Sequence, residues 1–382
     1  MKFLNNYLLY VTGLGLLLGI LFYIFFQHIV FISIPISWKV PQKTLASKKS
    51  ISLEIWNGTT LKKNTKNIVG ANDQELLTIA IKHWLIELGE EVSSLQNIQL
   101  QSCMMDVHEQ ELFLSFDASF LKQDWSIEQK VFLIESLQRT LYSLCPTLTS
   151  IHYCTHYKPL VDSHLSFSQA WPISGFTSAD HNSITIEPRG STIILDHSGD
   201  ERERGREIYN HYEYHITAQF EDELQRELNL HHIDTSLLRR ENEWYDKEKK
   251  QRLLNRLNPA LFIHITTYAQ PERTLATLNI YYHCTHPVKD FWLNRPAHDW
   301  ILQNNAHCAN LSATRSFAYH LYNHLLKLSS SWRIKKPCGI PLTITEGILP
   351  PSLIIEIGLP NPKAWKTIIK PLCDSLETLL LD

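Results

Sequence analysis

The stretch that decides the fold is Pro351-Ser-Leu-Ile-Ile-Glu356-Ile-Gly-Leu-Pro-Asn-Pro362, an apolar strand that carries one carboxylate near its end. Continuous apolar strands are typical of parallel sheets that are buried on both faces. An ionised carboxylate is costly there unless a cation, hydrogen bonds or a ligand compensates it. The pattern therefore predicts that Glu356 belongs to a site. The alternative is a strand-end carboxylate paired with an arginine such as Arg206 or Arg240.

Three upstream segments are predicted to supply partners for this glutamate. They are Thr192-Ile-Ile-Leu-Asp196-His-Ser-Gly-Asp200, then Tyr212-Glu213 at the start of a helix, and Leu261-Phe-Ile-His264-Ile-Thr266-Thr on another apolar strand. Around them, predicted strands (192–196, 233–238, 260–266, 277–283 and 352–357) alternate with predicted helices (212–228, 247–257, 313–328 and 363–380). This alternation predicts an α/β domain with a mostly parallel sheet and helices on both faces.

In this order and at this spacing, the four segments resemble the zinc-dependent N-acetylmuramoyl-L-alanine amidases, which cut peptidoglycan between the lactyl ether and the stem peptide. The resemblance covers residues 191–382, which we expect to form an amidase-like α/β domain. It implies Zn²⁺ as the cofactor and peptidoglycan as the partner. It also implies Glu356 as the catalytic base and Glu213 as a metal ligand.

The two ligand histidines of that family are missing from their expected positions. Asp196 matches the strand-ending aspartate of the family, but the first histidine falls on Gly199 and the second on Thr266. His197 and His264 each lie two residues too early. Because strand side chains repeat with period two, His264 is expected about 6.6 Å behind Thr266, which is about three times a zinc–nitrogen bond.

Several interpretations stay open at this point. A relocated metal site would use His197, His264 and a carboxylate such as Asp200, whereas the alternative is a pair of hydrogen-bonded histidines at strand ends. Glu213 is either a metal ligand or a first-turn glutamate favoured by the helix dipole. The residues expected to line the pocket are Asp196, Gly199, Asp200 and Thr266.

The predicted function is that of an amidase-like cell-envelope protein that acts on or binds peptidoglycan, with an impaired or lost zinc site. The alternative is a non-catalytic pseudoenzyme that binds peptidoglycan or regulates a hydrolase. Whether hydrolysis survives is open on the sequence, because a zinc hydrolase needs three protein ligands and an open position for water.

The preceding region is predicted to be a small α+β domain over residues 53–176. A strand at 51–56, a helix at 74–88, a strand at 112–117, a helix that Ser126 opens with a Ser-x-x-Gln capping box and a strand at 151–156 fit a β-α-β-β-α-β order. Leu112–Asp117, Ile134–Thr140, Asp162–Phe167 and Trp171–Phe176 resemble the GerMN domain of spore-germination proteins. Such domains are non-catalytic companions in cell-envelope proteins. Residues 177–190 read as a polar linker.

The amino terminus contains an uncharged run of residues 7–26, which is long enough to cross a bilayer. We therefore expect residues 1–38 to be a single-pass transmembrane anchor in the inner (cytoplasmic) membrane and residues 39–52 a tether. The resemblances imply that the globular part lies in the periplasm or outside the cell. The lysines at 39, 43, 48 and 49 follow the run and favour the opposite orientation.

Composition excludes one class of partner. The chain has 382 residues, 44% of them hydrophobic, and a formal net charge of −3. No basic stripe interleaves with aromatic residues, so a nucleic-acid partner is not expected. The seven cysteines are dispersed and form no CxxC pair, so no disulfide framework or zinc knuckle follows from them.

Overall fold

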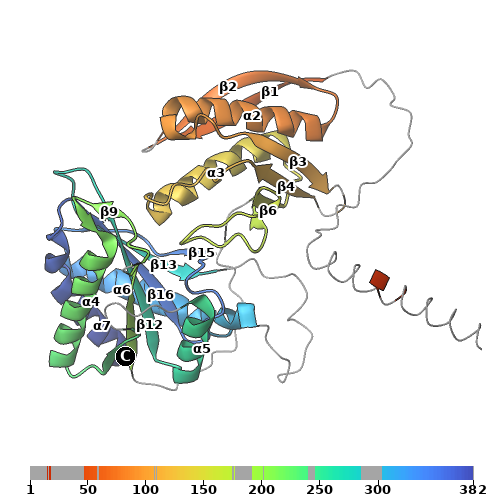
Figure 1. Cartoon of the computed structure of the whole chain (residues 1–382). Coiled ribbons are helices and arrows are strands. Elements are labelled where there is room, and N and C mark those ends of the chain that lie inside the picture. The colour runs from red at the N-terminus through yellow and green to blue at the C-terminus, as the bar shows by residue number, and fades with distance from the viewer. Residues whose placement is uncertain are drawn as a thin grey trace, which may run out of the picture. The chain divides into compact units, whose positions relative to one another are not determined.

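The computed structural model describes residues 15, 17, 18, 47–57, 60–106, 108, 110–173, 176, 192–200, 202–239, 246–284 and 303–381. Residues 1–45 and residues 46–382 form two separate compact units. The described residues of the second unit form a mixed α/β protein (Figure 1). Residues 47–176 are called the first half below, and residues 192–381 the second half.

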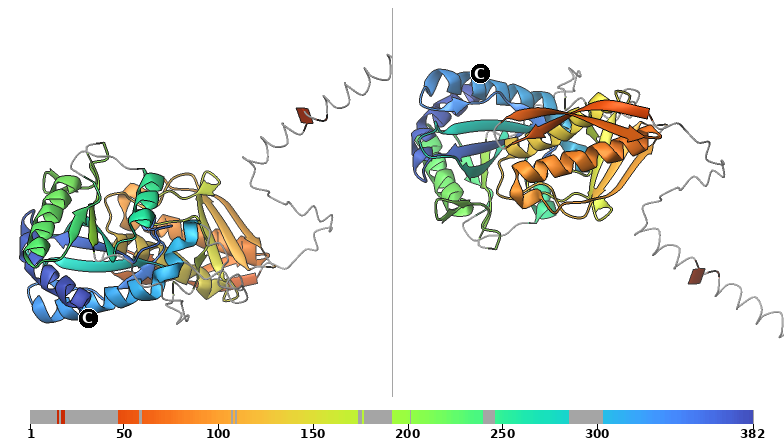
Figure 2. Two further views of the ribbon diagram at one scale, coloured as in Figure 1. Left: turned by 90° about the horizontal axis from the view of Figure 1, so that it is seen from below. Right: turned by 90° about the horizontal axis from the view of Figure 1, so that it is seen from above.

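The first half contains an antiparallel hairpin, a separate sheet and two helices. The hairpin is β1 (Ser47–Trp56) with β2 (Leu61–Gly70), and α2 (Asp73–Glu91) packs along it (Figure 2). The second sheet contains β3 (Leu100–Asp106), β4 (Glu111–Phe116), β5 (Ser150–Thr155), β6 (Lys158–Pro159) and β7 (Trp171–Pro172). Helix α3 (Ile127–Leu144) connects the parallel neighbours β4 and β5.

This half differs from the expected order in three places. Strand β1 begins at Ser47, inside the residues expected to be a tether, β2 was not predicted, and β3 has a place in the predicted order but was given no residues. Strand β2 has the sequence LKKNTKNIVG, whose lysines and asparagines hide the period-two pattern of a half-buried strand. It pairs along the whole length of β1, so tertiary pairing outweighs its weak local preference.

The second half is built on a seven-stranded sheet in the order β11-β8-β12-β16-β13-β14, with β15 beside β13. All neighbours are parallel except β13 and β16, so the sheet is mostly parallel as expected. A short hairpin, β9 with β10, precedes the first helix. The strand bounds are β8 Ile193–His197, β9 Glu207–Ile208, β10 His211–Tyr212, β11 Thr235–Leu237, β12 Leu261–Ala269, β13 Thr277–His283, β14 Arg333–Ile334, β15 Cys338–Ile340 and β16 Ser352–Leu359.

Helices cover this sheet on both faces. The helices are α4 (Glu213–Leu230), α5 (Lys247–Leu257), α6 (Leu311–Leu328) and α7 (Ile369–Leu381). Helix α7 contacts both α4 and α6, and their apolar side chains share one core with Ile263 and Ile355 of the sheet. Helix α5 lies on the other side (Figure 1), where Leu254 packs with Ile194 and Phe262.

The core of the first half continues onto the sheet of the second. Tyr281 and Ile354 belong to the same buried cluster as Phe116 and Leu133 of the first half. Because side chains alternate along a strand, Ile354 and Glu356 lie on one face of β16. The face that carries Glu356 is therefore the face that packs against the first half.

The predicted membrane anchor needs a correction. Among the residues that the structure describes, no helix is long and apolar enough to cross a membrane, so the predicted single-pass location in the inner membrane is wrong. An uncharged run of about 20 residues is a necessary condition for a spanning helix, not a sufficient one. Most of the expected span lies outside the described residues, which include only 15, 17 and 18 of it.

Candidate functional site

The four segments singled out in the sequence meet at one edge of the second-half sheet. Strands β8, β12 and β16 are parallel neighbours, so their carboxyl ends lie together, where α/β sheets bind ligands. Asp196 is the register partner of His264, and Thr266 is the register partner of Glu356. Glu213 is the first residue of α4, which follows the β9–β10 hairpin.

Glu356 is fully buried and surrounded by hydrogen-bond donors of the protein. Its Oε1 accepts from the main-chain N–H of Ile127 at 2.9 Å and from Nη1 of Arg206 at 3.2 Å. Its Oε2 accepts from the amide of Asn279 at 3.3 Å and the hydroxyl of Tyr281 at 3.2 Å. Burial raises the pKa of Glu356, and Arg206 and these hydrogen bonds oppose that rise.

Glu213 is equally enclosed. Its Oε1 accepts from the Thr266 hydroxyl at 2.5 Å and from the Thr267 main-chain N–H at 3.0 Å, and its Oε2 accepts from the Arg206 main-chain N–H at 3.0 Å. Gly205 has a φ of +71° and lies so close that an added Cβ would stand 2.7 Å from Oε2. Glycine is therefore required at 205 both by the backbone conformation and by the carboxylate.

Arg206 contacts both carboxylates, Glu356 through its guanidinium and Glu213 through its main-chain N–H. Nη1 of Arg206 donates to the Thr267 carbonyl at 2.8 Å as well as to Glu356, and Nη2 lies 3.2 Å from Nε2 of His164. The side chain is buried, and its Nε has no hydrogen-bond partner. Burial lowers the pKa of Arg206, but Glu213 and Glu356 outweigh it and the net direction is upward.

The first half supplies a second layer of charged groups around Arg206. Lys130 of α3 is fully buried, and its Nζ lies 2.6 Å from Asp162 and 3.3 Å from Nδ1 of His164. Burial lowers the pKa of Lys130, although Asp162 opposes this. Burial, followed by the charges of Arg206 and Lys130, holds the pKa of His164 well below its usual value.

His264 belongs to a separate buried network. Its Nδ1 lies 2.8 Å from Oδ2 of Asp196, which also accepts from Lys250 of α5 at 2.6 Å, and Oδ1 accepts from Arg239 at 2.8 Å. Burial alone would raise the pKa of Asp196, but Lys250, Arg239 and His264 hold it well below its usual value. Burial lowers the pKa of His264. The two cations would repel a metal ion at this imidazole.

The structure does not bring His197 and His264 together, so the relocated metal site is not assembled. His197 follows Asp196 on β8, and successive strand residues face opposite sides of a sheet. His264 shares the face of Asp196, whereas Nδ1 of His197 lies 2.5 Å from Glu221 of α4 on the other face. The alternative of hydrogen-bonded histidines at strand ends describes both residues.

The remaining predicted pocket residues shape the loop after β8. Gly199 has a φ of +75°, and an added Cβ would lie 2.9 Å from the Glu203 carbonyl oxygen and 2.9 Å from Cβ of Tyr214. Asp200 accepts from the main-chain N–H groups of Arg202 at 2.7 Å and Glu203 at 2.8 Å. Asp200 therefore holds a turn, and its Oδ2 lies 4.0 Å from Nη1 of Arg239.

The residues at this edge do not fit a zinc ion. A catalytic zinc needs three protein ligands with free lone pairs and an open position for water. Each oxygen of Glu213 and Glu356 already accepts a hydrogen bond from a protein donor. The Thr266 hydroxyl donates its hydrogen to Glu213 and the positive guanidinium of Arg206 interacts with both glutamates. A second cation here would be repelled.

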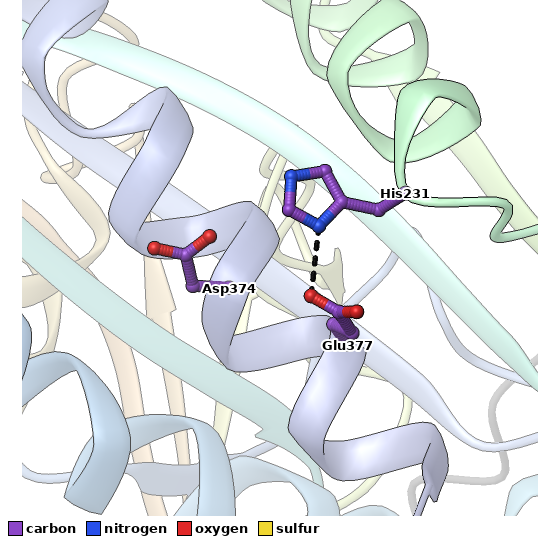
Figure 3. Close-up of side chains that lie close together, drawn as sticks. All are labelled: His231, Asp374 and Glu377. Carbon is purple, nitrogen blue, oxygen red and sulfur yellow. Dashed lines mark hydrogen bonds and ion pairs between the residues drawn. The ribbon is translucent and has the colours of Figure 1, made fainter.

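Among the described residues, one group away from this edge has the spacing of metal ligands. His231 at the end of α4 and Asp374 and Glu377 of α7 have ligand atoms within 4.8 Å of one another (Figure 3). Nδ1 of His231 already lies 2.7 Å from Oε2 of Glu377. All three are half-buried, and an ion pair that joins α4 to α7 accounts for the arrangement.

No family model matches the chain, and no curated protein matches it at a significant level. Similar solved structures are N-acetylmuramoyl-L-alanine amidases. The catalytic domain of CwlV from Bacillus (Paenibacillus) polymyxa var. colistinus is 12% identical, covers 49% of this chain and 96% of its own, and has a TM-score of 0.34. An amidase from Clostridium difficile 630 is 13% identical, covers 50% of this chain and 95% of its own, and has a TM-score of 0.36.

A third such structure is an N-acetylmuramoyl-L-alanine amidase of Nostoc punctiforme. It is 12% identical, with coverage of 50% of this chain and 94% of its own, and its TM-score is 0.37. A likeness of this degree carries no argument about the activity of this chain.

Arg206 was expected only as an alternative partner of Glu356, and the structure contains that ion pair. Ile127 and His164, which reach the site from the first half, were not expected, and neither was Asn279, the register partner of Glu356 on β13. No local pattern marks these residues. The one available signal was that a buried carboxylate requires compensation by some other part of the chain.

Proposed function

We propose that this chain is an amidase-like protein of the cell wall that binds peptidoglycan without hydrolysing it. The peptidoglycan partner rests on the resemblance of four separate sequence segments to the amidases. In this proposal residues 53–176 are a GerMN-like companion domain, residues 177–190 a linker and residues 191–382 the amidase-like domain.

The observation that carries the loss of hydrolysis is the state of Glu356. Metal-assisted amide hydrolysis needs a carboxylate with a free lone pair to take a proton from the attacking water. Four protein donors occupy the two oxygens of Glu356, and the side chain is fully buried. A water or a substrate amide could reach it only if the first half moved away from the sheet.

The proposal is tested with the full-length chain and its Glu356→Gln variant on purified peptidoglycan sacculi. Glutamine keeps the size of the side chain and cannot act as a base. We expect both proteins to release no new L-alanine amino groups above a buffer control. Release by the wild-type chain that Glu356→Gln abolishes would contradict the proposal and support an active amidase.

Binding is measured separately by sedimentation of the wild-type chain with the same sacculi. We expect the chain to pellet with sacculi and to stay in solution without them. A chain that stays in solution in both cases would remove peptidoglycan as the partner, whatever the outcome of the hydrolysis assay.

A further inference from the structure

The chain itself supplies a permanent positive charge, the guanidinium of Arg206, next to Glu356. Arginine keeps its charge at all relevant pH values, and its planar donors suit carboxylate and carbonyl acceptors. The Arg206 side chain donates to Glu356 and to the Thr267 carbonyl, while its main-chain N–H donates to Glu213. One residue therefore contacts both acids that the amidase resemblance assigns to metal chemistry.

The same guanidinium contacts the first half of the chain. Its Nη2 lies 3.2 Å from Nε2 of His164, and the glutamate that it pairs with accepts the Ile127 main-chain N–H at 2.9 Å. Ile127 is the first residue of α3, and the Ser126 capping box fixes that end of the helix. Both contacts are buried and join residues more than 40 positions apart in the chain.

We infer that Arg206 takes the place of the metal ion as a structural cation, and that it fastens the first half to the carboxyl edge of the second-half sheet. The comparison with a metal rests on the proposed function. The fastening itself rests on the hydrogen bonds of Arg206 and Glu356 alone. The site is thus a buried ionic joint between the two halves, and peptidoglycan contacts another surface.

A metal site cannot be recovered by removing the arginine. An imidazole at position 199 would need a Cβ within 2.9 Å of the Glu203 carbonyl oxygen and of Tyr214, on a backbone with a φ of +75°. Such contacts force the chain to shift, and the left-handed φ adds strain for any residue but glycine. At the second histidine position, the Thr266 hydroxyl donates a hydrogen bond to Glu213.

The test compares Arg206→Met with Arg226→Met in the full-length chain. Arg226 is exposed and pairs with Glu223 within α4, so it controls for the loss of an arginine. Removing one partner of a buried ion pair leaves an uncompensated charge, and we expect Arg206→Met to lower the Tm by at least about 5 °C. We expect less than about 1 °C for Arg226→Met.

Hydrogen exchange shows whether the loss reaches the first half. We expect faster exchange in peptides that span residues 126–130 and 162–166 of Arg206→Met, and no change in Arg226→Met. Wild-type exchange in these peptides together with a wild-type Tm would overturn the inference.

A third variant covers the case in which Arg206→Met does not fold. Arg206→Met combined with Glu356→Gln removes both charges, so the double variant should fold where Arg206→Met does not, and should have the higher Tm where both fold. Losses that simply add would overturn the ionic joint. These results are independent of sedimentation with sacculi, so failure of the joint and failure of peptidoglycan binding can be told apart.

Discussion

Glu356 shows how a single buried carboxylate constrains its surroundings. Every lone pair of Glu356 that hydrolysis would use has a protein donor. The donors are Asn279 and Tyr281 on the neighbouring strand, Ile127 of α3 and Arg206 in the loop before the β9–β10 hairpin. The need for compensation could be predicted from the sequence, because the strand is apolar throughout. The identity of most donors could not, because they lie up to 229 positions away.

The lowered pKa of His164 leads to a prediction of how the stability of the chain depends on pH. Burial and the charges of Arg206 and Lys130 hold the pKa of His164 well below its usual value, and His264 acts in the same direction. The nearby carboxylates are Asp162, which pairs with Lys130, and Glu356, which pairs with Arg206. A histidine in the unfolded chain has a pKa of about 6.5. Below that pH the unfolded chain binds a proton at His164, whereas the native chain keeps His164 neutral. The stability that neutral His164 contributes is complete above pH of about 6.5 and is lost as the pH falls.

The measurement is the free energy of unfolding between pH 8 and pH 5 for the wild type and His164→Gln. We expect His164→Gln to flatten the dependence below pH of about 6.5 by up to about 1.4 kcal/mol per pH unit. His215→Gln removes an exposed imidazole and serves as the control. Equal slopes for the wild type and His164→Gln would contradict the buried neutral histidine.

Gly205 gives a second prediction for a single residue. Gly205→Ala should destabilise the chain by more than the roughly 1–2 kcal/mol that a left-handed φ costs, because its Cβ would also displace Glu213. Gly347→Ala is the control, since Gly347 has a similar φ of +74°. Thermal and urea unfolding of both variants would measure the difference, and equal losses would argue against the contact with Glu213.

Strands and helices of the second half could be predicted well from the sequence. Apolar runs mark β8, β12 and β16, and period-3.6 patterns mark α4 and α5, with bounds close to those observed. Strand β2 was missed and the residues of β3 were not located, because lysine-rich LKKNTKNIVG and short LQSCMMD owe their pairing to neighbours that a local pattern does not reveal.

The capping box of α3 is an element whose local chemistry serves the site. The Ser126 hydroxyl accepts from the Gln129 N–H at 3.1 Å and the Gln129 side chain accepts from the Ser126 N–H at 2.9 Å, as the sequence predicted. Ser126→Ala should lower the free energy of unfolding by about 1–2 kcal/mol. It should also speed exchange of the Ile127 amide.

Asp246→Ala is the matched control, because Asp246 caps the exposed start of α5. It should cost about 0.5–1 kcal/mol and leave the Ile127 amide unchanged. If Ser126→Ala and Asp246→Ala gave the same Ile127 exchange rate, the cap would have no role in presenting this amide to Glu356.

At the scale of the whole molecule, the sequence indicated two halves. It did not indicate that the first half packs over the sheet face of the second half that carries Glu356. The covering follows from Tyr281 and Ile354, which read as ordinary strand residues yet pack into the core of the first half. The composition of residues 7–26 suggested a membrane span that the described residues do not contain. The covering could not be predicted, since packing between distant segments leaves no periodic signal in the chain.

The central claim is that an arginine, and not a metal, compensates the two glutamates. The most direct test is the zinc content of the purified full-length chain after removal of loosely bound metal, with Glu213→Ala and His231→Ala measured alongside. We predict well below one zinc per chain, and any residual zinc should depend on His231 and not on Glu213, because only the His231 cluster has ligand spacing among the described residues. One zinc per wild-type chain that Glu213→Ala removes would contradict the account.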